Sequence, residues 1–235
     1  DNITLEYCYI RNKVNYWTNC NDWAIKNCIF GCNNCCAIET GSSSGRFNLV
    51  VTNNLFSQAA GICNLNNGNS GILISNNVFL KGTSTDDGTV SNMDNVLFSN
   101  NIFFQEKPAA TSSLSNCTFN NNLTFSTSNN TLPPNDCATC AGTNNIINQD
   151  PLFTTYTAGQ NWSAAFNLIL QGTSPGHLTG ADGTDLGVYG SANIFSETGE
   201  PPIPVIRTVT ISNTNATVGT SLNVTVTATN PDPDQ

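Results

Sequence analysis

One short phrase, repeated six times in the first half of the chain, limits the folds that this sequence can adopt. It reads apolar-x-apolar-x-Asn-Asn-apolar-Phe, as in LVVTNNLF, ILISNNVF and VLFSNNIF. The first two copies carry Cys8 and Cys28 in place of the second Asn, and the last copy ends in Thr124. The copies occupy residues 3–10, 23–30, 49–56, 72–79, 96–103 and 117–124.

The spacing and the internal pattern of the copies predict a parallel β-helix. The second-Asn column falls at residues 8, 28, 54, 77, 101 and 122, so the repeat is 20 to 26 residues long. Each copy alternates with a period of two and lacks the 3.6-residue stripe of a helical repeat. Each unit is therefore expected to form one coil, stacked on the next at a strand spacing of about 4.8 Å. The alternative is an antiparallel β-sandwich in which the Asn-rich phrases are loops.

Each column of the repeat has an expected task in a β-helix. The Asn pairs are expected at a tight bend, because Asn tolerates the left-handed conformation and stacked amides bond from coil to coil. The Phe column at 30, 56, 79 and 103 re-enters the core after the bend. The columns expected to point inward are Ile3, Trp23, Leu49, Ile72, Val96 and Cys117, and Leu5, Ile25, Val51, Ile74, Phe98 and Phe119.

Some positions that should point outward are apolar, and these predict a covered surface. Val50, Leu73 and Leu97 lie between the inward columns and form a candidate partner surface. The first explanation is a loop that folds back over the apolar stripe, such as Gly82 to Met93, or a bend that shifts which residues point outward, and the second is a partner protein. A further outward stripe between the Asn bend and the Phe column contains Ile29, Leu55, Val78, Ile102 and Leu123.

Composition narrows the partners and the compartment. Seven Lys and Arg against sixteen Asp and Glu give a net charge of −9, so nucleic acid is not an expected partner. The sequence has no apolar run of about 18 residues, so no membrane span is predicted. Ten cysteines favour an oxidising compartment, and the predicted location is extracellular or at the cell surface. The start at Asp1, without Met or signal peptide, fits a processed or excerpted chain.

The cysteine spacings favour disulfides over metal binding. Cys137 and Cys140 have the spacing of one half of a zinc site, but no second Cys pair follows, and no metal site is predicted. They are expected to form a local staple. The other candidate bridges join adjacent coils, Cys36 to Cys63 and Cys8 to Cys28, whereas Cys20, Cys32, Cys35 and Cys117 are left unassigned.

The segment from Asp150 to Gly190 reads as an end cap and carries a resemblance to a known family. Its runs DPLF at 150–153, FNL at 166–168, SPG at 174–176 and GTDLGVYG at 183–190 resemble the closing segment of secreted bacterial right-handed β-helix proteins. These proteins belong to the broad pectate-lyase-like superfamily. The resemblance covers residues 1–195 and implies an all-β fold that begins with a right-handed parallel β-helix.

A second region follows the solenoid. Residues 196–206 read as a Pro-rich linker. Residues 207–235 are expected to begin an immunoglobulin-like β module, with strands at 207–212 and 221–229. Because an isolated hairpin is marginal in water, the chain is expected to continue beyond Gln235, or the hairpin to complete its sheet on the solenoid or on a neighbouring subunit.

The sequence offers little catalytic chemistry, and no catalytic residue is predicted. Polysaccharide lyases need a base and a means of neutralising the uronate, and the nearest group here is Lys81 with Asp86-Asp87. His177 is an isolated fragment of the pattern that a polygalacturonase-type hydrolase would show. Asp182 and Asp185 are candidate calcium ligands but are read as turn residues, and no cofactor is expected.

The favoured function is therefore a non-catalytic extracellular or cell-surface structural or adhesion protein, such as the subunit of an assembly or filament. Self-association or surface glycans are the expected partners. The alternative is a carbohydrate-active enzyme, either a polysaccharide lyase or a hydrolase, or a glycan-binding module. The sequons in this Asn-rich and Thr-rich chain are expected by chance, so they do not predict glycosylation.

Overall fold

The computed structural model describes residues 2–16, 21–40, 47–58, 61–65, 70–81, 88–110, 113–192, 195–201, 203–212, 218–219 and 221–229. The chain divides into two compact units, residues 1–199 and 200–235. Throughout the described residues, regular secondary structure consists of strands, without helices, so the all-β prediction is confirmed.

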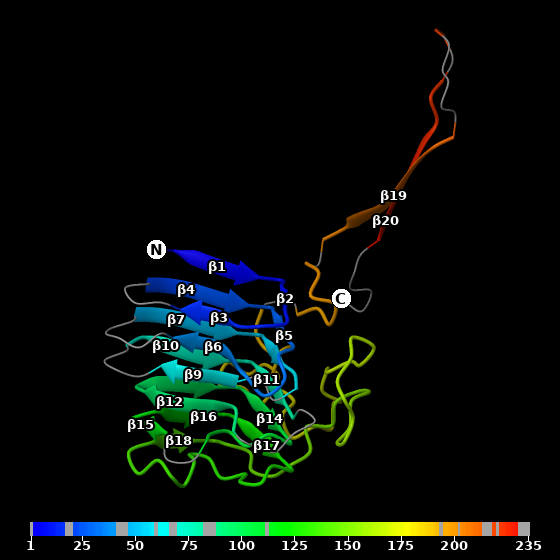
Figure 1. The fold of residues 1–235 in the computed structure, drawn as a ribbon. Coiled ribbons are helices and arrows are strands. Elements are labelled where there is room, and N and C mark those ends of the chain that lie inside the picture. The colour runs from blue at the N-terminus through cyan, green and yellow to red at the C-terminus, as the bar shows by residue number, and fades with distance from the viewer. Residues whose placement is uncertain are drawn as a thin grey trace. The chain divides into compact units, whose positions relative to one another are not determined.

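The first unit is a parallel β-helix (Figure 1), as the repeat predicts. Successive strands belong to sheets A, B and C in turn, and each strand pairs in parallel with its counterpart one coil away. Sheet A contains β1 (Ile3–Glu6), β4 (Asn21–Lys26), β7 (Phe47–Thr52), β10 (Ile72–Ser75), β13 (Val96–Ser99), β16 (Thr118–Asn120) and β18 (Ala141–Thr143). Sheet B contains β2 (Tyr9–Ile10), β5 (Ile29–Phe30), β8 (Leu55–Phe56), β11 (Val78–Leu80), β14 (Ile102–Phe104) and β17 (Leu123–Phe125). Sheet C contains β3 (Val14–Tyr16), β6 (Cys36–Thr40), β9 (Gly61–Leu65), β12 (Val90–Asp94) and β15 (Leu114–Ser115).

The inward columns of the repeat form the core of the solenoid. From Ile25 onward the predicted inward positions are buried, and Phe98 stacks on Phe119 with ring centroids 4.4 Å apart. The first coil differs, since Ile3 is 42 % exposed and Leu5 is only half-buried. The reason is that β1 is the end strand of sheet A and has a neighbouring coil on one side only.

The Phe column forms the predicted aromatic stack. Neighbouring rings of Phe30, Phe56, Phe79 and Phe103 have centroids 4.7 to 5.1 Å apart and are nearly parallel, with interplanar angles of 5 to 15°. The in-register pairing of sheet B imposes this geometry, because Phe79 lies opposite both Phe56 and Phe103. All four rings are fully buried.

The two Asn columns at the bend between sheets A and B have different roles. The first column adopts the left-handed conformation, with φ between 53 and 59° at Asn53, Asn76, Asn100 and Asn121. The second column is fully buried and forms a ladder: the Asn77 side-chain amide donates to Asn101 Oδ1 at 3.0 Å and its Oδ1 accepts from Asn54 at 3.1 Å. The ladder extends to Asn145.

The ladder also satisfies backbone groups at the bend. The side-chain amides of Asn54, Asn77 and Asn122 each donate to two carbonyl oxygens, for example from Asn77 to Ser75 and to Val51 of the preceding coil, both at 2.9 Å. The oxygen of each side chain accepts from the backbone N–H one coil before it. Every buried polar atom in the series therefore has partners, which is what makes a polar column tolerable inside an apolar core.

The segment that follows the coils, which the sequence predicts as an end cap, packs along the side of the solenoid. Residues 150–199, here called the strap, lie against the outer face of sheet B, and part of this segment is visible in yellow-green beside sheet B in Figure 1. Its apolar side chains and the outward residues of sheet B form a second core. The sheet residues in it are Ile29, Leu55, Val78, Leu80, Ile102, Phe104 and Leu123, and the strap residues are Phe153, Tyr156, Leu168, Leu170, Leu186, Val188 and Phe195.

Hydrogen bonds fix the direction of the strap. Asn121 Nδ2 donates to Thr179 O, Asn100 Oδ1 accepts from Ala181 N, and Asn53 Nδ2 donates to Gly190 O, at 2.7 to 2.9 Å. The strap therefore runs back along the solenoid, from the later coils toward the earlier ones. This segment covers the outward stripe of sheet B. Residues 82–87 of the loop from Gly82 to Met93, the cover suggested from the sequence, lie outside the described part.

The second unit contains one antiparallel hairpin. Its strands are β19 (Val205–Ile211) and β20 (Val224–Thr229), close to the predicted ranges. Val209 lies opposite Val226, and their side chains are 59 % and 53 % exposed. Arg207 and Glu200 form an ion pair within this unit. The remaining strands of an immunoglobulin-like module are not among the described residues.

Candidate functional site

The outer face of sheet A carries the apolar column predicted as a partner surface. Val50, Leu73 and Leu97 lie side by side in register on β7, β10 and β13. Leu97 is 38 % exposed and the other two are half-buried. Two residues farther along each strand lie Thr52, Ser75 and Ser99, so an uncharged hydroxyl column accompanies the apolar one.

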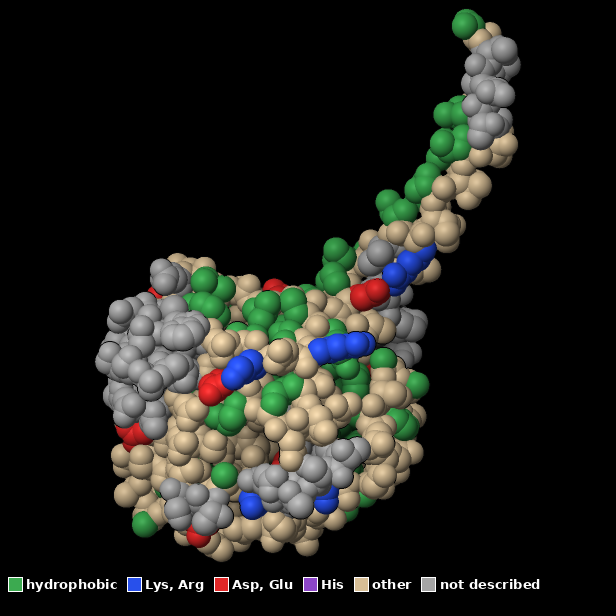
Figure 2. Space-filling model, viewed as in Figure 1, with side chains coloured by type: hydrophobic (Ala, Val, Ile, Leu, Met, Phe, Trp, Pro, Cys, Tyr) green, Lys and Arg blue, Asp and Glu red, His purple; other side chains and the backbone are tan. Residues whose placement is uncertain are grey.

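The hydroxyl column is bonded to its own neighbours. Ser75 Oγ donates to Thr52 Oγ1 at 3.1 Å, and Thr52 Oγ1 donates to Asn53 Oδ1 at 2.8 Å. The charged groups of this sheet lie on the first two coils, where Lys26 and Glu6 form an ion pair at 3.3 Å. The middle of sheet A therefore presents a flat, uncharged and partly apolar surface. Figure 2 shows one face of the solenoid, on which the coloured Lys, Arg, Asp and Glu side chains are few and scattered.

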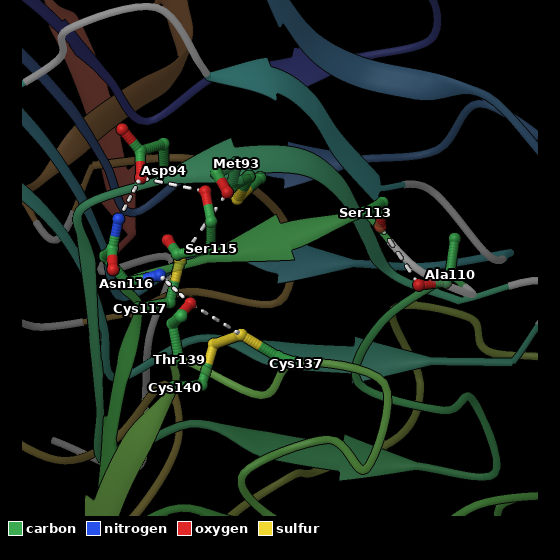
Figure 3. Close-up of a disulfide and its surroundings, with 10 residues drawn as sticks. All are labelled: Met93, Asp94, Ala110, Ser113, Ser115, Asn116, Cys117, Cys137, Thr139 and Cys140. Carbon is green, nitrogen blue, oxygen red and sulfur yellow. Dashed lines mark hydrogen bonds between the residues drawn. A yellow bond between two sulfur atoms is a disulfide. The ribbon is translucent and has the colours of Figure 1, made fainter.

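Two disulfides join the cysteines at the predicted positions. Cys36 in β6 and Cys63 in β9 are linked between adjacent coils, with Cα atoms 5.5 Å apart. Cys137 and Cys140 are linked within the turn that precedes β18 (Figure 3). Thr139, between them, accepts a hydrogen bond from Asn116 N at 2.9 Å, which ties this turn to the coil before it.

The proposed bridge between Cys8 and Cys28 is absent, and both residues have free thiols. The pairing of β2 with β5 places the two cysteines level in adjacent coils, so their Cα–Cβ bonds run in parallel rather than toward each other. Each thiol donates to a backbone carbonyl instead, Cys8 to Glu6 at 3.4 Å and Cys28 to Lys26 at 3.2 Å. Burial raises the pKa of Cys28 to about 12, so this thiol stays protonated.

The structure also assigns cysteines that the sequence left open. Cys32 and Cys35 form a disulfide. Cys117 is buried with a free thiol that donates to Ser115 O, and burial raises its pKa. Cys20 lies outside the described residues. The chain therefore combines three disulfides with three buried or half-buried thiols in its described part.

The acidic residues of the strap act as turn residues. Asp182 Oδ1 accepts from the Thr184 hydroxyl at 2.7 Å and from its N–H at 3.2 Å. Burial raises the pKa of Asp182, but the bonds from Thr184 outweigh that effect and the net shift is downward. Asp185 Oδ1 lies 2.8 Å from His177 Nδ1 and accepts from Leu178 N. These contacts fix the turns that lie against the solenoid.

No metal centre emerges from the described part of the chain, where no group of three or more His, Cys, Asp or Glu could hold an ion. Of the group formed by Lys81 and the two adjacent acids, only Lys81 is described, and its N–H donates to Phe104 O. Asp86 and Asp87 lie outside the described residues. Lys13 forms a surface ion pair with Glu39, at 2.6 Å.

A cavity beside the Cys36–Cys63 disulfide escaped the sequence reasoning. It has a volume of about 200 Å³, and its walls come from four successive parts of the chain, including Asn34, Ser91, Glu106 and Ala110. Glu106 is 1 % exposed, and its Oε1 accepts from Gly88 N at 2.9 Å. The only hint in the sequence is Glu106, an acidic residue that comes soon after an apolar strand, in the run Phe103 to Pro108.

The backbone at this cavity requires a glycine. Gly88 has φ of +99°, and a Cβ atom there would lie 2.3 Å from Ala110 N. The segments 88–91 and 106–110 are also joined directly, because Thr89 N donates to Lys107 O and Ala110 N donates to Val90 O, both at 2.9 Å. The Glu106 carboxylate is therefore held in place by backbone that is itself closely packed.

Comparisons with known proteins add no family to this description, since neither a protein-family model nor a curated protein sequence matches the chain. Within the described residues, no helix has the length and hydrophobicity needed to cross a membrane.

Proposed function

We propose that the protein is a non-catalytic extracellular or cell-surface structural protein that associates with copies of itself through the outer face of sheet A. The observation that supports this proposal most is the apolar column Val50, Leu73 and Leu97, which points outward on three successive coils. Apolar residues in register on a flat sheet favour face-to-face packing, with sheets about 10 Å apart.

The outward residues described on β7, β10 and β13 are uncharged, which favours a second copy as the partner. Two identical surfaces that meet bring like residues together, so charged side chains would repel. The residues beside the column on these coils are Thr52, Ser75 and Ser99, which are neutral. The chain as a whole carries a net charge of −9, so a neutral patch is the part of its surface where copies repel least.

The rest of the solenoid has the properties of a rigid support. The Asn ladder and the Phe stack pass through successive coils, and the strap covers the outer face of sheet B. Three disulfides in the described residues are compatible with an oxidising, extracellular compartment. We further propose that the exposed hairpin of the second unit contains the first strands of an immunoglobulin-like module.

Sedimentation velocity over a range of protein concentrations tests the proposal. The wild-type protein is expected to associate reversibly at tens of micromolar, a range typical of interfaces of modest area. Leu73→Asp places a charge at the centre of the column and should leave a monomer at every concentration. Leu178→Asp makes the same change at a leucine that is 62 % exposed on the strap, and it should associate like the wild type.

Two results would contradict the proposal: a wild-type protein that is monomeric throughout, or a Leu73→Asp variant that associates as strongly as the wild type. The enzymatic alternative is tested with the same preparation. A polysaccharide lyase or hydrolase would release new chain ends from acidic or neutral polysaccharides, and the structural proposal predicts no release.

A further inference from the structure

Two columns of outward side chains run in register along the whole of sheet A. The members of the first column are Thr4, Ala24, Val50, Leu73, Leu97, Thr118 and Ala141. The second column lies two residues farther along each strand, and its members are Glu6, Lys26, Thr52, Ser75, Ser99, Asn120 and Thr143. Among the described strands, β10 is the fourth of the seven in this sheet, so the apolar part of the first column is centred on the middle of the sheet.

A second copy that packs on this face can be related to the first by one of two two-fold axes. If the axis runs along the strands through Leu73, the two solenoids are antiparallel, and the first coil of one copy lies over the last coil of the other. If the axis runs along the solenoid, the two solenoids are parallel, and each coil lies over its own counterpart. The two arrangements bring different side chains together, so the composition of the columns distinguishes between them.

The sizes of the side chains favour the antiparallel arrangement. It places Leu73 against its own copy and Val50 against Leu97, so that the most exposed leucine of the column faces a smaller side chain. Farther from the centre it places Ala24 against Thr118. The parallel arrangement would instead pair leucine with leucine at Leu97 and alanine with alanine at Ala24, which leaves voids beside the leucines. Because packed protein surfaces tolerate few voids, the antiparallel pairs fit better.

The charged side chains favour the same arrangement. Glu6 and Lys26 form an ion pair on the first two coils, with side chains about one-third exposed. The antiparallel arrangement brings these two residues to Thr143 and Asn120, which are neutral and have hydroxyl and amide groups that can bond to ionic side chains. The parallel arrangement would bring the ion pairs of the two copies together, and each pair would lose water against the other.

We propose that two copies pack through sheet A with their solenoids antiparallel and with Leu73 at the two-fold axis. This inference rests on the proposed self-association and specifies which residues meet in it. Gly199, the last residue of the first unit, lies beside the first coil, where a Cβ atom on it would be 3.7 Å from Tyr9 N. The two chains therefore leave their first units at opposite ends of the pair.

Cross-linking of introduced cysteines with a short bismaleimide distinguishes the two arrangements, at a protein concentration at which the wild type associates. Ala24→Cys and Thr118→Cys place thiols on strands that are four strand spacings apart, about 19 Å. In an antiparallel pair, a mixture of the two variants should give a mixed dimer, and neither variant alone should cross-link. In a parallel pair, each variant alone should cross-link. A tag on the Thr118→Cys chain separates the three possible dimers by mass.

Controls link the mixed dimer to this face of the sheet. Its yield should exceed at least tenfold the background from the wild type, which has its native thiols only. Ala158→Cys places a thiol at an exposed position of the strap and should give no more dimer than the wild type. Leu73→Asp, added to both cysteine variants, should reduce the mixed dimer to the background, because it prevents the association.

The proposal is overturned if either cysteine variant alone cross-links as efficiently as the mixture. It is also overturned if the mixture gives no mixed dimer above the background although the protein sediments as an associated species. Both results leave the proposed function in place when Leu73→Asp is monomeric in sedimentation. A wild-type protein that sediments as a monomer at every concentration overturns the proposed function as well.

Discussion

The outer faces of sheets A and B arise from the same repeated phrase but are used differently. In three coils the two outward apolar residues are five positions apart, in the pairs Val50 and Leu55, Leu73 and Val78, and Leu97 and Ile102. The sheet B members are fully buried under the strap, whereas the sheet A members are half-buried or exposed. An outward apolar stripe therefore indicates that a cover is needed, and the cover can come from the same chain or, as we propose for sheet A, from another copy.

The largest expected effect comes from one matched pair within one coil. Ile102→Ala should reduce the free energy of unfolding by about 4 kcal/mol, because it leaves a cavity in the second core under the strap. Leu97→Ala, on sheet A of the same coil, should cost less than about 1 kcal/mol in the monomer. Urea denaturation at low protein concentration measures both values. Equal losses in the two variants would mean that the two faces do not differ in burial.

Removal of the Cys36–Cys63 disulfide tests whether a covalent bridge in sheet C stabilises the outer faces of sheets A and B together. The bridge closes a loop with a sequence separation of 27 residues between strands of sheet C. Loop entropy predicts that replacing both cysteines with alanine lowers the free energy of unfolding by about 3.5 kcal/mol. Because both faces belong to the same coils, both should unfold together at a lower urea concentration. Separate transitions for the strap and the solenoid would contradict this expectation.

A smaller effect on stability is expected at alkaline pH, and it arises from a tyrosine on the covered face of sheet B. Burial raises the pKa of Tyr156, in the strap core, to about 12 from an ordinary value of 10, and its hydroxyl donates to Gln160 O. Below pH 10 the phenol is protonated in both folded and unfolded states. As the pH rises from 10 through 12, only the unfolded state ionises, and roughly 2 kcal/mol of stability should be lost.

The measurement for this effect is urea denaturation between pH 9 and pH 12, with Tyr156→Phe as the reference protein. Phenylalanine does not ionise, so the variant should lose less stability than the wild type over the same range. Parallel pH profiles for the two proteins would show that the Tyr156 phenol ionises as readily in the folded protein as in the unfolded one.

The repeat made most of the solenoid predictable. Alternation fixes which side chains point inward, and identical spacing in successive coils places Phe56, Phe79 and Phe103 in one stack. The different roles of the two Asn columns were not predicted, because both columns contain the same type of residue. Only the backbone shows that the first Asn turns the chain while the second, such as Asn77, points into the core.

The strap and the cavity depend on contacts that no local pattern encodes. Asn53 donates to Val188 O across a sequence separation of 135 residues, and the strap has no repeat of its own. The outward stripe of sheet B did indicate a missing cover, but it did not identify the segment. Glu106 lies outside the repeated phrase, and the other residues of the cavity come from separate coils, so composition and spacing gave no reason to group them.

Labelling of aliphatic side chains by a photoactivated carbene, followed by mass spectrometry, tests the difference between the two faces most directly. In dilute protein, Leu73 and Leu97 should be labelled, while Val78 and Ile102 should stay unlabelled beneath the strap. At concentrations where the protein associates, labelling of Leu73 and Leu97 should fall by several fold, and Val78 and Ile102 should not change. Labelling of Leu73 and Leu97 that does not depend on concentration, in protein that does associate, would contradict the assignment of sheet A as the shared face.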